Sequence, residues 1–251
     1  MIFNQFKVVI PARYGSKRLP AKPLLTICGK PIFWHVVQRV LEAGVELKNI
    51  IVATDDSRIK VKAKALGIPV MLTSIDHISG TDRINEVASK LNWPKEQIVI
   101  NVQGDEPLIP SNLIVQLMHF VHANPQFDVH TAVSAISSYS DFIDHNVVKA
   151  IITEYDQAIY FSRSAAPLNR DNLSDFSNAK KHIGVYVYKV GVLNKICDLP
   201  ESILEGIEKL EQLRVLTNKL TIGAMEYASK IPHGIDTEDD YINVKYLMEK
   251  L

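Results

Sequence analysis

Four cationic side chains cluster near the start of the chain, in a loop that follows a short apolar run. Within Val8–Leu24, VVIPARYGSKRLPAKPL, these are Arg13, Lys17, Arg18 and Lys22. Fixed cations and backbone N–H groups suit a polyphosphate, and open α/β sheets bind ligands in such loops at strand carboxyl ends. The alternative is a solvated basic loop, but four cations within ten residues of a chain with net charge 0 favour phosphate binding.

Two carboxylates could hold a metal ion beside those phosphates. Asp105 follows an apolar run in IVINVQGDEPLI, and Asp236 stands in GIDT before the last predicted helix. A carboxylate at the carboxyl end of a buried strand is a natural Mg²⁺ ligand. The alternatives are a turn in which Asp105 bonds its own backbone, and a helix cap to which Asp236 adds an acceptor.

Other segments carry weaker signals. In SGTDRINEVA, Ser79 and Arg83 lie at a helix start, where a base or a phosphate could bind, although helix capping and a solvated arginine explain them more simply. Weak when taken alone are Arg163 in YFSR, His182 in KHIGVY, and Glu211 and Gln212 in LEQLR. The sequence has no GxGxxG, Walker A, HExxH or GxSxG motif, so none of the functions of those motifs is predicted.

Alternating strand-like and helical runs would position these groups. Strand, helix, strand, helix indicates parallel strands with crossover helices on both faces of a sheet. The first half predicts strands at Lys7–Ile10, Asn49–Ala53 and Gln97–Val102, and helices at Ile32–Ala43, Ser57–Leu66, Thr81–Leu91 and Ser111–Val121, the last capped by Ser111.

The pattern changes after about Phe127, where strand-like runs come closer together. These are Val129–Ala135, Val147–Thr153, Ala158–Phe161 and Ile183–Tyr188. They are followed by a predicted helix at Leu204–Leu216, a strand at Lys219–Met225 and a closing helix at Thr237–Lys250. Within the first of these helices, the spacing places Glu208, Glu211 and Gln212 on one face. We therefore predict an α/β fold with a mostly parallel mixed sheet between helices, in one domain spanning 1–251, with a smaller antiparallel lobe at about 129–218.

Composition excludes several classes of protein. The chain has 28 Lys+Arg against 28 Asp+Glu, so it lacks the basic excess that nucleic-acid binding by bulk electrostatics needs. Polar residues interrupt its longest charge-free stretch, so we predict no membrane span and no signal peptide. Cys28 and Cys197 lie far apart in the sequence, which argues against a disulfide framework and fits a cytoplasmic protein.

The order of the motifs resembles a known family. PARYGSKRLPAKPL, IVATDD, SGTDR, NVQGDEPLI, YFSR, KHIGVY, LEQLR and GIDT are similar to the 3-deoxy-manno-octulosonate cytidylyltransferases, or CMP-KDO synthetases. The resemblance implies a glycosyltransferase-A-like nucleotidyltransferase fold and a reaction of CTP with the acidic sugar KDO that gives CMP-KDO and pyrophosphate. It also implies that Mg²⁺ is required and that the product is used for lipopolysaccharide in Gram-negative bacteria. It further implies a cytoplasmic homodimer, in which the second lobe helps to form the sugar site and the dimer contact.

The resemblance also assigns roles to residues. The triphosphate would be held by Arg13, Arg18 and Lys22. The cytosine or ribose would be contacted by Ser79, Arg83 and Gln103. Mg²⁺ would be ligated by Asp105 and Asp236, and it would bridge phosphate oxygens. The acceptor sugar would be contacted by Arg163, His182, Glu211 and Gln212. At Ala21 the chain departs from the LPGKP sequence common in the family, and alanine restricts the backbone there.

The implied chemistry agrees with the residues found. The anomeric hydroxyl would attack the α-phosphorus with pyrophosphate leaving in line, which needs positioning and charge neutralisation but no covalent nucleophile. Arg13, Arg18, Lys22 and Asp105 would therefore form the catalytic group. One alternative is activation of another acidic sugar, such as an 8-amino analogue of KDO or a sialic acid. A second is a catalytically silent nucleotide-binding module. A third is an NAD-binding protein, which the missing GxGxxG motif disfavours.

Overall fold

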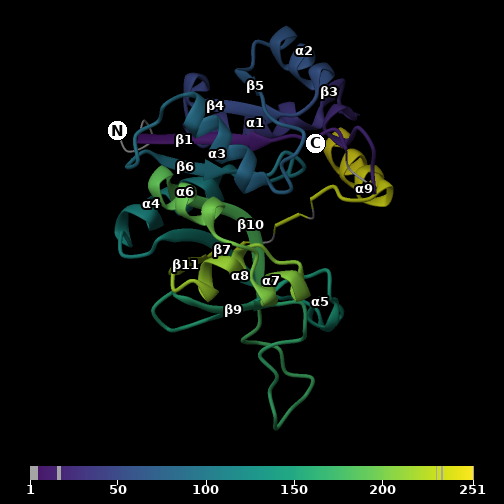
Figure 1. Cartoon of the computed structure of the whole chain (residues 1–251). Coiled ribbons are helices and arrows are strands. Elements are labelled where there is room, and N and C mark those ends of the chain that lie inside the picture. Colours follow the sequence, from purple (N-terminus) through teal and green to yellow (C-terminus); the bar gives the residue numbers. More distant parts are fainter. Residues whose placement is uncertain (1–4, 16–17, 230, 233, 251) are drawn as a thin grey trace.

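A mixed β-sheet forms the centre of the molecule (Figure 1). The computed structural model describes residues 5–15, 18–229, 231–232 and 234–250, and within them this sheet has nine strands. The main path runs β11-β7-β10-β6-β1-β4-β5, while β8 pairs with β10 and β9 pairs with β8. The strands are β1 (Phe6–Pro11), β4 (Ile50–Thr54), β5 (Val70–Leu72), β6 (Ile98–Asn101), β7 (Val129–Ala135), β8 (Lys149–Ile152), β9 (Ala158–Ser162), β10 (Lys180–Lys189) and β11 (Ile222–Glu226).

The first half of the chain builds the parallel part of the sheet. Strand β1 lies between β4 and β6 and is parallel to both, with Val9 opposite Ile51 on one side and Asn101 on the other. Both faces of these strands are covered, which explains apolar runs that do not alternate with polar residues. The strands predicted in this half are confirmed, and β5 was not predicted.

The second half continues the same sheet. Strand β10 runs antiparallel to β6, β7 and β8, and β11 is parallel to β7. The register between β10 and β7 shifts between Ile183 and Tyr186. The antiparallel strands predicted after Phe127 are thus confirmed, and they are joined to the parallel strands through β10.

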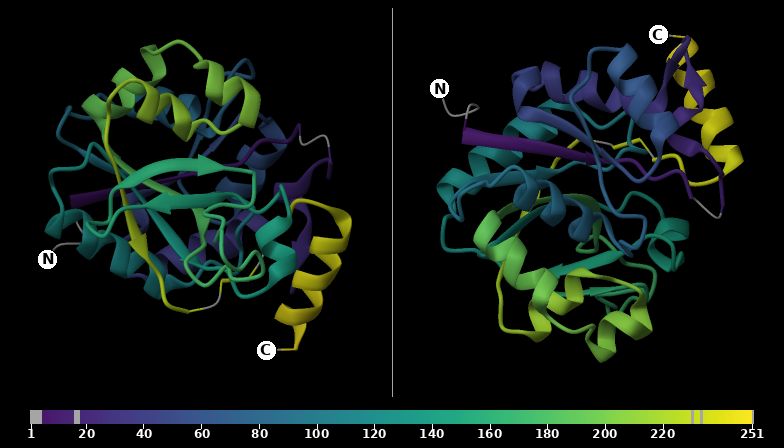
Figure 2. Two further views of the ribbon diagram at one scale, coloured as in Figure 1. Left: turned by 90° about the horizontal axis from the view of Figure 1, so that it is seen from below. Right: turned by 45° about the horizontal axis from the view of Figure 1, so that its top comes forward.

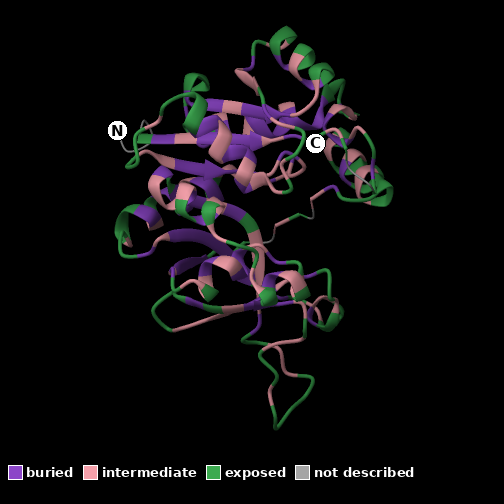
Figure 3. Cartoon of the chain, viewed as in Figure 1, coloured by how far each residue is buried: buried purple, intermediate pink, exposed green. Residues whose placement is uncertain are grey.

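Helices cover both faces of the sheet (Figures 1 and 2). Buried residues of α1, α2 and α4 pack on one face, and those of α3, α6 and α8 pack on the other, so the strands between them are buried (Figure 3). Within the described residues, none of the helices is long and apolar enough to cross a bilayer. The helices are α1 (Ile32–Glu42), α2 (Ser57–Ala65), α3 (Gly80–Lys90), α4 (Ser111–Ala123), α5 (Tyr139–Ile143), α6 (Val190–Asp198), α7 (Ile203–Glu208), α8 (Gln212–Thr217) and α9 (Glu238–Glu249).

Two sequence predictions about helices are wrong. The predicted helix at Leu204–Leu216 is two helices, because Lys209 adopts a left-handed conformation (φ 52°, ψ 47°) that ends α7. Glu208 is the last residue of α7 and Glu211 is the N-cap residue of α8, so the two share no helical face. Ser111 is the first residue of α4 and does not cap it, because Pro110, extended at φ −64°, takes the N-cap position.

The C-terminal segment returns to the first loop of the chain. Val244 of α9 packs with Ile235 against Ile27, which belongs to a small hairpin of β2 (Thr26–Ile27) and β3 (Lys30–Pro31). The Tyr241 hydroxyl donates to the carbonyl of Thr26 at 2.7 Å. Thr237 caps α9, in a capping box with Asp240. This packing brings Asp236 to the loop after β1.

Candidate active site

Two loops at the carboxyl ends of neighbouring parallel strands form the centre of the site. The loop after β1 carries the cations, and the loop after β6 carries Gln103 and Asp105. Ala21 adopts a left-handed conformation (φ 58°, ψ 16°) immediately before the 3₁₀ turn Lys22–Leu24. A left-handed conformation is unfavourable for any residue that has a Cβ. The backbone restriction expected from alanine at position 21 therefore applies to a residue in a left-handed conformation.

Lys22 lies between the two carboxylates that the sequence assigned to a metal. Its ammonium donates to Oδ2 of Asp105 at 2.5 Å, to Oδ1 of Asp236 at 3.1 Å and to the carbonyl of Ile235 at 2.7 Å. The residue is only 8% exposed. All three ammonium donors of Lys22 therefore have oxygen partners.

Backbone and side-chain contacts hold Asp236 next to Asp105. The N–H of Ile235 donates to the carbonyl of Asp105 at 2.9 Å. Arg18 pairs with the Asp236 carboxylate, with 3.0 Å between Nη2 and Oδ2. Residues more than a hundred positions apart in the sequence thus meet at one point of the sheet edge.

A cavity of about 540 Å³ opens beside this cluster. Its lining includes all the residues predicted for the nucleotide and both carboxylates predicted for the metal: Arg13, Arg18, Lys22, Ser79, Arg83, Gln103, Asp105 and Asp236. The structure therefore brings together the eight residues that the sequence assigned to CTP and Mg²⁺. Lys17, the fourth cation of the loop, lies outside the described residues.

Arg83 and Ser79 reach the cavity from the start of α3. Arg83 is 2% exposed, contacts the Thr73 hydroxyl, and donates to Oδ2 of Asp55 and to the carbonyl of Ser74, each at 3.2 Å. Burial lowers the pKa of Arg83, and the Asp55 charge opposes that shift. Ser79 caps the helix by accepting from the N–H of Asp82 at 3.1 Å. Both side chains are held in place by the protein itself.

Asp55 is a supporting residue to which sequence reasoning gave no role. Besides holding Arg83, its Oδ1 accepts from the N–H of Tyr14 at 3.2 Å and so anchors the cationic loop. The sequence signal for this role was the position of Asp55 in IVATDD. Asp55 directly follows β4, so it is a carboxylate at the carboxyl end of another parallel strand.

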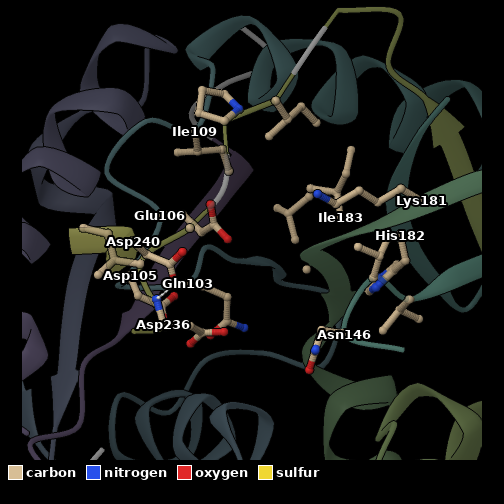
Figure 4. A pocket seen from close by; sticks show the side chains of 18 of the residues that line it. Gln103, Asp105, Glu106, Ile109, Asn146, Lys181, His182, Ile183, Asp236 and Asp240 are labelled. Carbon is tan, nitrogen blue, oxygen red and sulfur yellow. Dashed lines mark hydrogen bonds between the residues drawn. The ribbon is translucent and has the colours of Figure 1, made fainter. Parts of the chain in front are cut away.

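A second cavity of about 680 Å³ is also lined by Gln103 (Figure 4). It shares four residues with the first cavity: Arg18, Gln103, Asp105 and Asp236. Figure 4 shows Glu106 and the two aspartates on one side and Lys181, His182 and Asn146 on the other. The two cavities therefore meet at the carboxylates.

Two titratable groups in the second cavity have strongly shifted pKa values. Burial, with the nearby charge of Asp105, raises the pKa of Glu106 to about 8. Burial lowers the pKa of His182 to about 3, and its Nε2 lies 3.1 Å from the Thr131 hydroxyl. At neutral pH His182 is thus an uncharged hydrogen-bonding group, and Glu106 is largely protonated. Sequence reasoning missed Glu106, which directly follows the predicted metal ligand.

The four residues predicted for the acceptor sugar lie in different surroundings. His182 lines the second cavity, whereas Glu211 and Gln212 line a smaller one of about 100 Å³ with Tyr186 and Tyr188. Burial raises the pKa of Glu211, and hydrogen bonds from Thr81 and Ser79 partly oppose this. Among the described residues the structure does not gather these four around one cavity, and their role in sugar binding stays a prediction.

Arg163 is held by backbone carbonyls of the protein itself. Its guanidinium donates to the carbonyls of Glu208 at 2.6 Å, His145 at 2.9 Å and Lys209 at 3.4 Å. It is not among the described residues that line the three cavities. Its contacts tie the end of β9 to two turns.

The oxygens around Lys22 suit a hard divalent cation. Two carboxylates and one backbone carbonyl converge on the ammonium, and Mg²⁺ takes such oxygen ligands, commonly one or two carboxylates plus substrate phosphates and water. The described part of the chain has no cluster of three or more His, Cys, Asp or Glu arranged for a metal. Asp105 and Asp236 therefore fit Mg²⁺ that takes its other ligands from phosphate and water.

Comparison with known proteins gives consistent matches along the chain. A family model described as "Cytidylyltransferase" matches residues 7–222. The "3-deoxy-manno-octulosonate cytidylyltransferase" of Cellvibrio japonicus (strain Ueda107) is 45% identical over 252 residues, which cover 97% of this chain and 98% of the relative. The protein of the same name from Psychromonas ingrahamii (strain DSM 17664 / CCUG 51855 / 37) is 45% identical over 246 residues, which cover 94% and 95%.

Solved structures agree with these matches. A "CMP:2-keto-3-deoxy-manno-octonic acid synthetase complexed with CTP" superposes with a TM-score of 0.89 at 40% identity and covers 98% of each chain. The "inositol-1-phosphate CTP transferase from T. maritima" has a TM-score of 0.67 at 15% identity, covers 99% of this chain and 96% of its own, and shows a shared fold. The predicted nucleotidyltransferase fold is confirmed.

Proposed function

Because the chain belongs to the 3-deoxy-manno-octulosonate cytidylyltransferase family, we propose that it transfers CMP from CTP to the anomeric hydroxyl of KDO in a Mg²⁺-dependent reaction. The relatives are named for this activity and cover nearly the whole chain, and the solved structure most similar in sequence among those compared above is a complex with CTP. The family resemblance inferred from the motifs is confirmed, as is a cytidylyltransferase activity.

One observation carries the proposal for the nucleotide site. The cavity of about 540 Å³ is lined by the three cations proposed to bind phosphate and by both carboxylates. In phosphoryl transfer the protein contributes positioning and charge stabilisation, so these are the groups that the reaction requires. Arg13, Arg18 and Lys22 would neutralise the triphosphate, and Gln103 and Ser79 would contact the nucleoside.

The bonds that change are those around the α-phosphorus. The anomeric oxygen forms a new bond to this atom, the bond to the bridging oxygen of pyrophosphate breaks, and the hydroxyl proton is lost to solvent or to a nearby base. The cations facing the β- and γ-phosphates stabilise the charge that develops on the departing pyrophosphate. When bound by Asp105 and Asp236, Mg²⁺ would supply further charge neutralisation at the phosphates.

The second cavity is the proposed place of the acceptor sugar. It adjoins the nucleotide cavity at Asp105 and Asp236, so a sugar there would present its hydroxyl to the α-phosphate. His182, uncharged at neutral pH, would exchange hydrogen bonds with sugar hydroxyls. Family membership further supports a cytoplasmic homodimer whose product serves lipopolysaccharide biosynthesis, and we include these in the proposal.

The test is pyrophosphate release from CTP with Mg²⁺, measured with KDO, without KDO and with EDTA. We expect release that requires KDO and stops with EDTA. Asp105→Asn should nearly abolish turnover while circular dichroism remains that of the wild type, and near-normal activity in this variant would contradict the metal assignment. Pyrophosphate release only with an 8-amino analogue of KDO or a sialic acid would show that the acceptor is that sugar and not KDO. Tight CTP binding without pyrophosphate release for any sugar acid would indicate a silent nucleotide-binding module.

A further inference from the structure

The ammonium of Lys22 occupies the point at which the proposed metal ligands converge. Its three partners are two carboxylate oxygens and one carbonyl oxygen at 2.5 to 3.1 Å. Its side chain is 10% exposed, so the charge is held mostly away from water. Lys22 was expected to hold phosphate, yet its donors are all engaged with the groups expected to hold the metal.

Electrostatics explains why the cluster is stable without a nucleotide. Asp105 and Asp236 are two like charges that approach a common point, and without a cation between them they would repel each other. Lys22 lies between them and Arg18 pairs with Asp236 from the outside, so two cations balance two anions. A partly buried charge needs such compensation, because burial of an unpaired charge is costly.

We propose that Lys22 is a positioning residue that holds Asp105 and Asp236 together in the CTP-free enzyme and competes with the divalent metal for them. On CTP binding, the phosphates accept the ammonium, and the two carboxylates become available to the metal. The Lys22 ammonium and both carboxylates then have oppositely charged partners in the CTP-free and in the CTP-bound enzyme. The inference rests on the proposed function, since it assumes that CTP and a divalent metal use this site.

Competition predicts that a metal alone binds weakly. A divalent cation entering without CTP would leave the Lys22 ammonium beside a like charge, with no phosphate to receive it. Removal of the Lys22 charge should therefore increase metal affinity in the absence of nucleotide. A lysine that only contacts phosphate would instead leave the affinity for the metal alone unchanged.

The experiment measures Mn²⁺ binding to the CTP-free protein by electron paramagnetic resonance, with Mn²⁺ in place of Mg²⁺. We expect Lys22→Met to bind Mn²⁺ at least ten times more tightly than the wild type. Arg13→Met is the matched control, because it removes one charge from the same cavity and Arg13 has no ion pair with either carboxylate among the described residues. Its affinity should stay within about twofold. An affinity of Lys22→Met no higher than that of the wild type overturns the inference.

Thermal unfolding gives a second readout. Mn²⁺ alone should raise the Tm of Lys22→Met by about 5 °C at about 100 times its Kd, and at the same concentration it should raise the wild-type Tm by about half as much or less. Lys22→Gln repeats the test if the methionine variant does not fold, and a Mn²⁺-induced rise in the wild-type Tm as large as that of the variant overturns the inference. Failure of the proposed function is distinct: it would appear as wild-type protein that releases no pyrophosphate with CTP, KDO and Mg²⁺.

Discussion

The carbonyl oxygen of Pro11 lies so close to Gly104 that a Cβ on that glycine would be 2.5 Å from it. Real Cβ atoms do not approach a backbone oxygen this closely, so one of the two loops would have to move. The two loops in question are those that carry the cations and Asp105. Gly104 therefore permits the close contact on which the site depends.

Gly104→Ala should displace Asp105 and reduce turnover. We expect kcat/KM to fall by about 100-fold, because a misplacement of about 1 Å has an effect of this size on a positioned reaction. The measurement is steady-state pyrophosphate release. Gly206→Ala in α7 is the control, since its Cβ would meet only the flexible end of Glu201 at 3.3 Å. Equal activity in the two variants would contradict the steric argument.

Ala21→Gly should stabilise the protein. Ala21 has φ 58°, a left-handed conformation that costs a residue with a Cβ about 1 kcal/mol and costs glycine little. We expect the free energy of unfolding to rise by about 0.5–1 kcal/mol in urea titrations. The exposed helical residue Ala65 provides the contrast, because Ala65→Gly should lower the free energy of unfolding by a similar amount. A loss of stability in both variants would show that Ala21 is not strained.

Arg163→Met should reduce stability more than affinity for the sugar. The arginine donates to three backbone carbonyls, and loss of a charged donor leaves them without it. We expect a loss of about 2 kcal/mol in the free energy of unfolding and a KM for KDO within about threefold of the wild type. The same change at exposed Arg170 should leave stability unaltered. A large rise in KM with unchanged stability would instead support the sugar contact that the motif implied.

Glu106→Gln should make the protein more resistant to alkaline pH. The folded-state pKa is raised from 4.5 to about 8, so between these values the unfolded chain has lost a proton that the folded protein keeps. Wild-type stability therefore falls as pH rises through this range and is fully reduced above about pH 8. We expect the variant to gain on the order of 4 kcal/mol relative to wild type on going from about pH 5 to about pH 9, measured by urea unfolding. Glu96→Gln, at a side chain 80% exposed, should show no such gain.

Much of the lining of the 540 Å³ cavity could be predicted from the sequence. The cations, Gln103 and Asp105 follow apolar runs that form adjacent parallel strands, and parallel strands place their following loops at one edge. Local sequence was therefore enough to assign these groups to one site.

The partners of those groups could not be predicted, because they depend on contacts between distant segments. Lys22 meets Asp236 only because α9 packs on the β2–β3 hairpin, and the carbonyl partners of Arg163 come from two separate turns. The helix break was missed because Lys209 adopts a left-handed conformation without the glycine or asparagine that usually signals one.

Strand β10 has a consequence for how the protein can move. It is hydrogen-bonded to β7 along one edge and to β8 and β6, at its two ends, along the other edge, so it joins the parallel and the antiparallel strands into one continuous sheet. A hinge rotation of one half against the other would break these ladders. Conformational adjustment during a catalytic cycle would therefore leave this sheet intact and fall on segments outside it.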